Sequence, residues 1–517
     1  MNTINKKLAK SAGIIGLGTT FSRVLGFVRD ILIAKIFGTS LFADSFFVAF
    51  RIPNLLRDLI GEGAANAAFV PVFSEYLVKK ERDDYWKLVN SLLKLMLVLL
   101  VVLTIIGVLL SPVIVNIIAP GFKSQPDKSQ LTIKLTQIIF PYILFAGLTA
   151  FLMGVLHSHR SFASPAFSPA MLNLALIMGA VWGAKKWGVY GLAWAVLLGG
   201  LVQVLLQVPP LLRTGFRLNL RGSFRHPAVK RIGHLLFPRV LGSCVYQLNL
   251  FVDTMLASLS RIVGEGGVSA LYYSNRLVQF PLAIFGISVA QAALPTMSAQ
   301  FQENSFKNLA RTISFSLRTV FFITIPSAVG LIVLAKPITA VLFQRGQFNS
   351  YSTQITSVAL TFYSIGLFAY SGIKILVSAF YSFQDTLTPV KVASFSLAVN
   401  IILNLILMFP LKVGGLALAT SISAISNFIF LFYFLKKKIS DLDGKKIINS
   451  SLRILLAALA MGLVARVSFA GLAPFISRQV FRLLAVIGIS IISYIIFSFI
   501  FRVEELERLK AWILRRK

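Results

Sequence analysis

The chain contains a single cysteine, Cys244, among its 517 residues. One thiol excludes a disulfide within the chain and a metal cluster held by cysteines. Charged residues make up only 13% of the chain, about half of the share in soluble domains. Acidic residues are the scarcest of these, with 18 Asp and Glu against 51 Lys and Arg. These deficits exclude a secreted disulfide scaffold and argue against a soluble enzyme.

Motifs for catalysis are also missing. The sequence has no G-x-x-x-x-G-K-[ST] phosphate loop, no H-E-x-x-H zinc motif and no nucleophile elbow. His157 and His159 stand beside Arg160 at an expected helix end, where an interfacial turn is the favoured interpretation over metal or proton chemistry. We therefore expect a protein that is not an enzyme and has no bound cofactor.

Apolar residues are abundant, at 56% of the chain. A spanning helix needs about 20 mostly apolar residues, and the sequence predicts an all-α polytopic membrane protein with fourteen such helices. Pro53 with Gly61 and Gly63 should break the second helix, and Pro281 with Gly286 the eighth. The expected spans are 12–37, 43–78, 87–111, 132–157, 164–184, 189–212, 229–259, 268–300, 312–335, 354–382, 389–409, 414–435, 450–470 and 480–501.

The net charge of +33 is explained by topology rather than by a nucleic-acid partner. Lys and Arg gather in alternate loops, and Lys123 and Lys128 belong to the poorer side. The rich side is cytoplasmic by the positive-inside rule, which places both termini in the cytoplasm. The tail, 503–517, is predicted to be a basic amphipathic helix on the membrane surface, in contact with anionic lipids.

An internal repeat organises the chain. Three separated segments recur at a constant offset of 224 residues. The offset spans six predicted helices, an even number, so the two copies should run in the same direction through the membrane. This predicts two parallel six-helix lobes, 1–225 and 226–440, with the substrate site between them. Two further helices, 441–502, have no counterpart. The recurring pairs are Ala68/Ala292, Pro71/Pro295, Ser74/Ser298, Ser158/Ser382, Pro165/Pro389 and the Val189–Ala195/Val413–Ala419 segments.

Charged residues inside the apolar stretches are the strongest functional signal. A charge at membrane depth costs about 2.5–3.5 kcal/mol even on a lenient scale, so such residues should face a watery cavity, a carboxylate or an anionic substrate. Arginine suits a diphosphate because its guanidinium is a fixed fork of donors that binds two oxygens at once. The residues concerned in the first two helices are Arg23, Arg29, Asp30, Asp44, Arg51, Arg57, Asp58 and Glu62, and those in the second half are Arg239, Asp253, Arg276 and Lys374.

Several motifs resemble one known family. F-S-R-V-L-G-F-V-R-D, A-D-S-F-F-V-A-F-R-I-P-N-L-L-R-D, G-E-G-A, A-F-V-P-V-F-S-E-Y and Y-Y-S-N-R-L together are similar to the MurJ (MviN) lipid II flippases. The resemblance implies fourteen helices, a V-shaped cavity between two lobes, and an apolar groove for a polyprenyl tail formed by the last two helices. It also implies that Arg23, Arg29, Arg57 and Arg276 bind substrate. Asp30, Asp44 and Glu62 match the family's cavity carboxylates, whereas Gln279 stands where some relatives carry Glu.

The resemblance implies a flippase that moves lipid II, an undecaprenyl-diphosphate-linked disaccharide peptide, from the cytoplasmic to the periplasmic leaflet by alternating access. The location would be the bacterial inner membrane, with cell-wall synthesis proteins as further partners. Two alternatives in transport remain: an exporter of another polyprenyl-linked saccharide and a cation-coupled antiporter of the multidrug and toxin extrusion (MATE) type. The antiporter predicts a cavity dominated by carboxylates, and this sequence has more arginines. A scaffold for wall synthesis that transports nothing is the third alternative.

A coupling ion is a further hypothesis. Asp253 is the lone carboxylate of the seventh apolar stretch, and Asn400 and Asn404 share a face of the eleventh, close to Thr420 in the twelfth. Oxygens of these types bind hard cations such as sodium, and protonation of Asp253 or the membrane potential are the other expected sources of coupling. Hydrogen bonding between helices is the competing explanation for the two asparagines.

Overall fold

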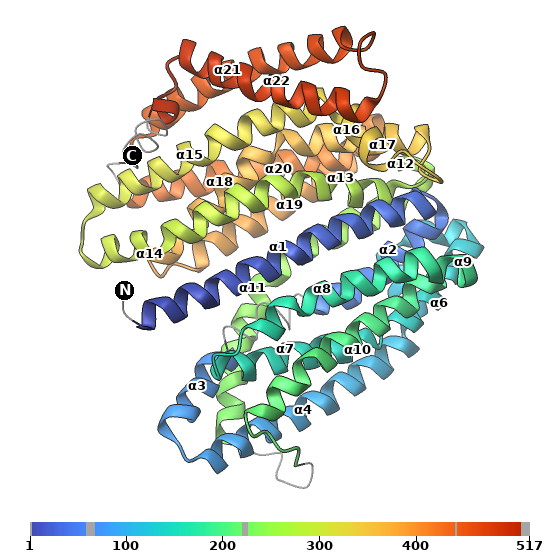
Figure 1. Ribbon diagram of the computed structural model, residues 1–517, viewed down its shortest axis with the longest axis vertical. Helices are drawn as coiled ribbons and strands as arrows, with labels where there is room; N and C mark the ends of the chain where they lie inside the picture. Colours follow the sequence, from blue (N-terminus) through green and yellow to red (C-terminus); the bar gives the residue numbers. More distant parts are fainter. Residues whose placement is uncertain (1–2, 58–67, 220–225, 440–441, 508–517) are drawn as a thin grey trace. The chain divides into compact units, whose positions relative to one another are not determined.

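The computed structural model describes residues 3–57, 68–219, 226–439 and 442–507. The described residues form helices joined by short turns, without a β-strand (Figure 1). Ten helices are long and apolar enough to cross a membrane, and a bent pair brings the number to eleven. The all-helical, multi-span class predicted from composition is therefore confirmed. The total of fourteen spans stays a prediction, since α1, α2 and α11 stand outside that set.

The chain divides into two compact units, Met1–Leu259 and Ser260–Lys517, which we describe separately. The elements of the first unit are α1 (Thr3–Phe37), α2 (Leu41–Arg57), α3 (Val70–Lys79), α4 (Arg82–Leu109), α5 (Ser111–Ile118), the 3-10 helix η3 (Pro120–Ser124), α6 (Pro126–Ile139), α7 (Tyr142–Ser158), α8 (Ala163–Met178), the π-helix η4 (Gly179–Gly183), α9 (Ala184–Trp187), α10 (Tyr190–Arg213) and α11 (Pro227–Ala257).

The second unit carries a similar succession and two additional helices. Its elements are α12 (Ser260–Val263), α13 (Gly267–Pro281), the π-helix η5 (Leu282–Ile287), α14 (Ser288–Gln302), α15 (Phe306–Val333), α16 (Ala335–Phe343), α17 (Ser350–Ile365), α18 (Leu367–Ser382), α19 (Leu387–Leu411), α20 (Val413–Lys438), α21 (Gly444–Gly471) and α22 (Gln479–Ile500).

Helix boundaries repeat with the offset found in the sequence. Adding 224 to the ends of α4 gives 306–333, which are the ends of α15. The same shift carries the start of α8 onto the start of α19, and the start of α1 onto the start of α11. It also carries the end of α7 onto the end of α18. The repeat therefore holds for the secondary structure, well beyond the residue pairs that first indicated it.

Two turns repeat in backbone conformation as well. Arg160 and Gln384 both have φ of 58°, and each closes the turn after a helix. Gly188 and Lys412, also 224 residues apart, have φ of 56° and 52°. Glycine adopts positive φ without strain, whereas lysine rarely does. The second repeat thus keeps the turn geometry of the first even where a residue with a β-carbon must adopt it.

The long apolar stretches that contain proline or glycine differ in whether they are broken. The eighth predicted span is one continuous helical stretch, Gly267–Gln302, so Pro281 and Gly286 do not break it; the π-helix η5 between α13 and α14 begins directly after Pro281 and contains Gly286. The tenth is divided into α17 and α18, which meet at Gly366 with a bend of 44°. Pro53, by contrast, lies within α2, which continues to Arg57. Gly61 and Gly63 lie outside the described residues.

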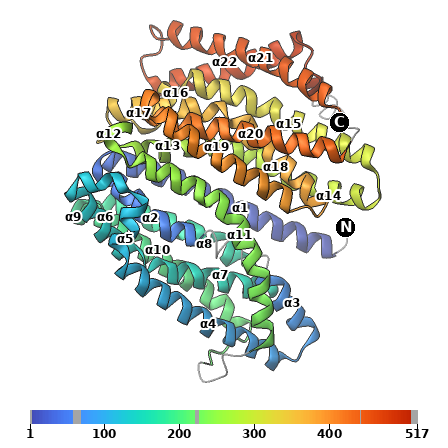
Figure 2. The same cartoon turned by 180° about the vertical axis from the view of Figure 1, so that it is seen from behind.

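By the repeat, α11 is the first helix of the second copy, yet it packs within the first unit. It contacts α4, α5 and η3 (Figure 2). At one end the Ser258 hydroxyl accepts a hydrogen bond from the Gly121 amide at 3.1 Å. A β-carbon at Gly121 would collide with the backbone at Ser258, so this approach needs glycine. The compact units therefore divide at 259, one helix after the repeat boundary predicted at 225.

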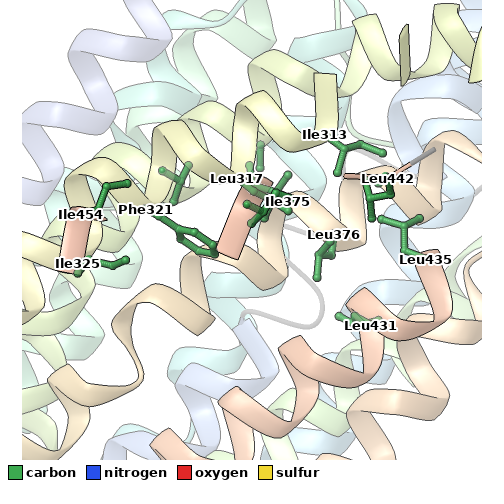
Figure 3. Close-up of a cluster of buried hydrophobic side chains, with 14 of the residues drawn as sticks. Ile313, Leu317, Phe321, Ile325, Ile375, Leu376, Leu431, Leu435, Leu442 and Ile454 are labelled. Carbon is green, nitrogen blue, oxygen red and sulfur yellow. The ribbon is translucent and has the colours of Figure 1, made fainter. Parts of the chain in front are cut away.

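The core of the second unit joins the additional helices to the repeat. Side chains of α15, α18, α20 and α21 meet in one apolar cluster that includes Leu317, Phe321, Ile375, Leu431 and Ile454 (Figure 3). A smaller cluster joins Leu334 to Ala465, Leu483 and Val486 of α21 and α22. The two helices without a repeat partner are thus packed against the second unit along α15.

Candidate functional site

Arg29 lies in the interior of the first unit and is only 7% exposed. Its Nε and Nη2 donate to Asp30 Oδ1 at 2.9 and 2.7 Å. Its Nη1 donates to the Asn173 side-chain oxygen of α8 at 2.8 Å. A buried guanidinium needs such partners because an uncompensated charge there is costly. The predicted pairing of Arg29 with a cavity carboxylate is thus present, within α1 itself.

Asn173 is the one member of this cluster that the sequence did not indicate. Its amide donates to the backbone oxygen of Ser22 at 2.9 Å and to the Ser22 hydroxyl at 3.2 Å, so it connects α8 to α1 at Ser22 as well as at Arg29. A β-carbon at Gly26 would lie 3.5 Å from this amide, so α1 packs closely against Asn173 at Gly26. No sequence signal marks the residue, because a single Asn in an apolar helix is common.

Asp44 forms an ion pair with Lys128, a residue that was not predicted as its partner. Lys128 Nζ donates to its Oδ2 at 2.8 Å, and the same ammonium lies 4.3 Å from the centre of the Phe122 ring. The prediction that Lys128 lies in a loop is wrong, since the residue is 3% exposed in the first turn of α6. Asp44 thus joins α2 to α6.

The other predicted residues of the first unit are differently placed. Arg23 is exposed on α1. Six residues separate it from Arg29, so the two side chains leave the helix about 120° apart. Arg57 is half-buried at the last position of α2. Asp58 and Glu62 lie outside the described residues. Arg23 and Arg29 therefore do not share one face of α1.

Arg276 lies near the end of α13, six residues before the π-helix η5 begins. Its guanidinium lies 5.1 Å from the centre of the Tyr272 ring, and Nη2 donates to the Tyr272 hydroxyl at 3.1 Å. Gln279 accepts from Nη1 at 3.5 Å and donates to Asn275 at 2.6 Å. Tyr272 and Gln279 thus orient the Arg276 guanidinium near the end of α13.

The four residues of the predicted ion site fall into two groups. Asn404 donates to the Asn400 side-chain oxygen at 2.8 Å, and Asn400 donates to the Thr420 hydroxyl at 3.3 Å. Both asparagines are fully buried between α19 and α20. Asp253, 5% exposed, belongs to α11 in the first unit. The structure brings together three of the four residues, as a hydrogen-bonded chain.

These features define a multi-span helical membrane protein with an internal repeat and arginines held inside each unit. Residues 33–489 match the model of the family described as "Lipid II flippase MurJ". The chain is 36% identical to the "Probable lipid II flippase MurJ" of Buchnera aphidicola subsp. Acyrthosiphon pisum, over 86% of this chain and 87% of that protein. It belongs to the MurJ lipid II flippase family.

Solved structures agree with this assignment. A lipid II flippase MurJ in an inward closed conformation is 30% identical, with a TM-score of 0.81 over 94% of this chain and 98% of the other. An inward-facing multidrug resistance transporter of the MATE family, of the MOP superfamily, is 18% identical, with a TM-score of 0.68 over 81% of this chain and 95% of the other. At 18% identity, the MATE transporter shows similarity of fold only.

Proposed function

We propose that this chain is a lipid II flippase, which carries the lipid-linked peptidoglycan precursor from the cytoplasmic to the periplasmic leaflet by alternating access. Family membership supports the substrate. The observation that carries the proposal is the Arg29–Asp30–Asn173 cluster, a permanent cation buried in the first unit and hydrogen-bonded to one carboxylate and one amide. An anionic headgroup is the ligand for which such a cation is suited.

The cluster suggests how Arg29 binds and releases substrate. Asp30 and Asn173 accept hydrogen bonds from the guanidinium, as diphosphate oxygens would. Diphosphate can replace these acceptors with bidentate contacts of the same kind, and Asp30 can take them back when the substrate leaves. In the absence of substrate, the Asp30 carboxylate then occupies the position of the diphosphate and keeps the Arg29 guanidinium desolvated and oriented. Arg23, Arg57 and Arg276 would complete the binding of the headgroup, with Asp44 and Glu62 near it.

The remaining parts of the chain have expected roles in the same cycle. We place the protein in the bacterial inner membrane with both termini in the cytoplasm. We assign α21 and α22 the groove for the polyprenyl tail, because they have no repeat partner and many of their outward side chains are large and apolar. Transport needs no bound cofactor in this proposal. Sodium, protons or the membrane potential would supply the energy, and cell-wall synthesis proteins are candidate partners.

Binding to purified full-length protein tests the substrate. We expect lipid II to bind the wild type, and Arg29→Ala to weaken binding about 10- to 100-fold, the range for hydrogen bonds to a charged group. Arg213→Ala, which removes an exposed arginine at the end of α10, is the matched control and should bind normally. Equal binding by Arg29→Ala would refute the assigned role. Tighter binding of a different polyprenyl-linked saccharide would support the alternative substrate.

A further inference from the structure

A basic cavity lies in the second unit, where the N-terminal half of α15 and the start of α21 line it. Its volume is about 620 Å³. Four basic side chains and one acidic side chain line it, together with apolar and hydroxyl groups. The lining residues are Lys307, Ala310, Arg311, Thr312, Ser314, Phe315, Arg318, Asp443 and Lys446. Arg318 and Lys446 are paired with Glu504 and Glu505, so Lys307 and Arg311 supply the positive charge that makes the cavity a candidate for an anion.

One face of α15 supplies most of the charge. Lys307, Arg311 and Arg318 follow one another at spacings of four and seven residues, so they project from the same side of the helix. Lys446 completes the basic set from the first turn of α21. Lys307, Arg311 and Lys446 are exposed. A smaller cavity of about 330 Å³ shares Asp443 and Lys446 and adds Lys445 and Arg453, so basic groups continue along α21.

Arg318 forms the buried end of the cavity, with 3% of the residue exposed. Its Nη1 donates to Glu505 at 2.8 Å and to Glu504 at 3.1 Å. Its Nε has no hydrogen-bond partner among the described residues. An unsatisfied buried donor on a charged group costs free energy, and an anionic oxygen in the cavity would satisfy it. This donor is a second sign of a ligand, independent of the surface lysines.

We propose that this cavity binds the phosphate of an anionic phospholipid headgroup. Phosphate matches the donors present: the Arg318 Nε–H at the buried end, and the Lys307, Arg311 and Lys446 charges near the opening. A lipid rather than a free ion fits the position, at the end of a spanning helix. The basic loops predict that this end is cytoplasmic, where anionic lipids gather beside juxtamembrane basic residues. Phe315, 49% exposed in the lining, offers apolar contact to the lipid backbone.

The bound headgroup would strengthen a connection between the two C-terminal helices and the second unit. Glu505 accepts hydrogen bonds from Arg318 of α15 and from Ser450 of α21, the latter at 2.9 Å. Arg453 of α21 donates to the Arg502 backbone oxygen at 3.0 Å. A phosphate on the other side of Arg318 would fix this arginine further. We therefore expect anionic lipid to raise the melting temperature of the protein as well as to bind.

The test measures lipid binding by full-length protein in nanodiscs or by native mass spectrometry. We expect phosphatidylglycerol to bind more tightly than phosphatidylcholine. Lys307→Gln/Arg311→Gln should weaken the binding of phosphatidylglycerol about 30-fold, from the usual contribution of two basic residues near an anionic membrane surface. Neither substitution touches the Arg318–Glu505 contact, so the variant should fold normally.

The matched control is Lys336→Gln/Arg345→Gln, which removes two exposed charges beyond the opposite end of α15. Phosphatidylglycerol binding should be unchanged in this control. Wild-type binding by Lys307→Gln/Arg311→Gln, or an equal loss in the control, would overturn the proposal. Inorganic phosphate is tested as a competitor. If it displaces phosphatidylglycerol and raises the melting temperature of the protein equally well, the cavity is a site for a free anion and not for a headgroup.

Discussion

Asp44 of α2 and Lys128 of α6 form a buried ion pair, with 2.8 Å between Oδ2 and Nζ and both side chains at most 3% exposed. The Phe122 ring lies beside the ammonium, so its surroundings are aromatic on one side and anionic on the other. Each charge makes the burial of the other tolerable. The pair holds two helices together in a region where Asp44 is a predicted cavity carboxylate.

We predict that removing either partner destabilises the first unit strongly. Lys128→Met leaves the Asp44 carboxylate without its ammonium, and breaking a buried pair in this way costs about 3–5 kcal/mol. Replacing both, as Asp44→Leu/Lys128→Met, should recover much of the loss because no uncompensated charge remains. Thermal unfolding of the purified variants measures this. Lys123→Met, at an exposed lysine of η3, should change little, and an equal loss there would contradict the assignment.

The sequence indicated the repeat and the pairing of Arg29 with Asp30 because both are local or periodic features. A constant offset can be found without any knowledge of packing, and Arg29 with Asp30 interrupts an apolar run. Lys128 was misplaced because its neighbours Asp127 and Ser129 are polar and resemble a loop. Its partner, Asp44, is 84 residues away. Only the packing of α6 against α2 decides that this lysine is buried.

The same reason explains why the sequence did not indicate Asn173 as a partner of Arg29. A neutral amide in an apolar helix has no charge to attract attention, and its contact with Arg29 spans 144 residues. The break of the tenth span at Gly366 was also not located, although the stretch was too long for one straight helix. Gly366 packs against Ser421 with no room for a β-carbon, which is a tertiary constraint.

We predict that Arg29→Ala abolishes transport while the protein still inserts into the membrane. Arg29→Lys should restore activity only in part, because lysine keeps the charge but loses the fork that contacts Asp30 and Asn173 together. Complementation of a strain depleted of its own flippase, with protein levels measured in the membrane fraction, makes the comparison. Full growth supported by Arg29→Ala would remove Arg29 from the mechanism.

Lys412→Gly should stabilise the second unit. Lys412 has φ of 52° and ψ of −130°, a conformation that costs a residue with a β-carbon about 1–3 kcal/mol. Gly188 occupies the equivalent turn of the first unit with φ of 56° and ψ of −139°. The melting temperature should rise for Lys412→Gly and fall for Gly188→Ala. A fall for Lys412→Gly would show that this lysine contributes contacts that outweigh its backbone strain.

Acidification should destabilise the first unit through His159. Burial, helped by the charge of Arg82, lowers the pKa of His159 from its usual 6.5, and its ring stacks on Trp86 with 5.7 Å between centroids. The unfolded chain takes up a proton near pH 6.5, and the folded chain resists it until the pH is lower. The stabilisation is therefore present above about pH 6.5 and is lost as the pH falls through the lowered pKa.

Melting temperatures measured from about pH 8 to about pH 5 test this effect. His159→Phe keeps the stacking without the titration, so its profile should be flatter than that of the wild type. His234→Gln, at an exposed histidine of α11, should keep the wild-type slope. If His159→Phe shows the wild-type slope instead, another group is responsible.

The prediction that reaches furthest concerns energy coupling through Asp253. This carboxylate is buried in α11, and adding the repeat offset of 224 to Arg29 gives its position. A buried carboxylate needs a cation, a proton or strong donors. The Asn400–Asn404–Thr420 chain offers oxygens of the kind that bind sodium, but its hydrogen bonds also suit a purely structural role. A sodium site and a purely structural role of this chain predict different responses of transport to substitution.

We expect Asp253→Asn to lower transport in proteoliposomes severely and to abolish the response of the remaining rate to sodium and pH. Thr420→Val should weaken the sodium response while the protein keeps its fold, because it removes one oxygen from the chain. Asp127→Asn, at an exposed carboxylate of α6, should leave both the rate and its ion dependence unchanged. Were transport indifferent to Asp253→Asn, to sodium and to pH alike, hydrogen bonding between α19 and α20 would be the whole role of the asparagines. The membrane potential acting on the arginines would then be the remaining source of energy.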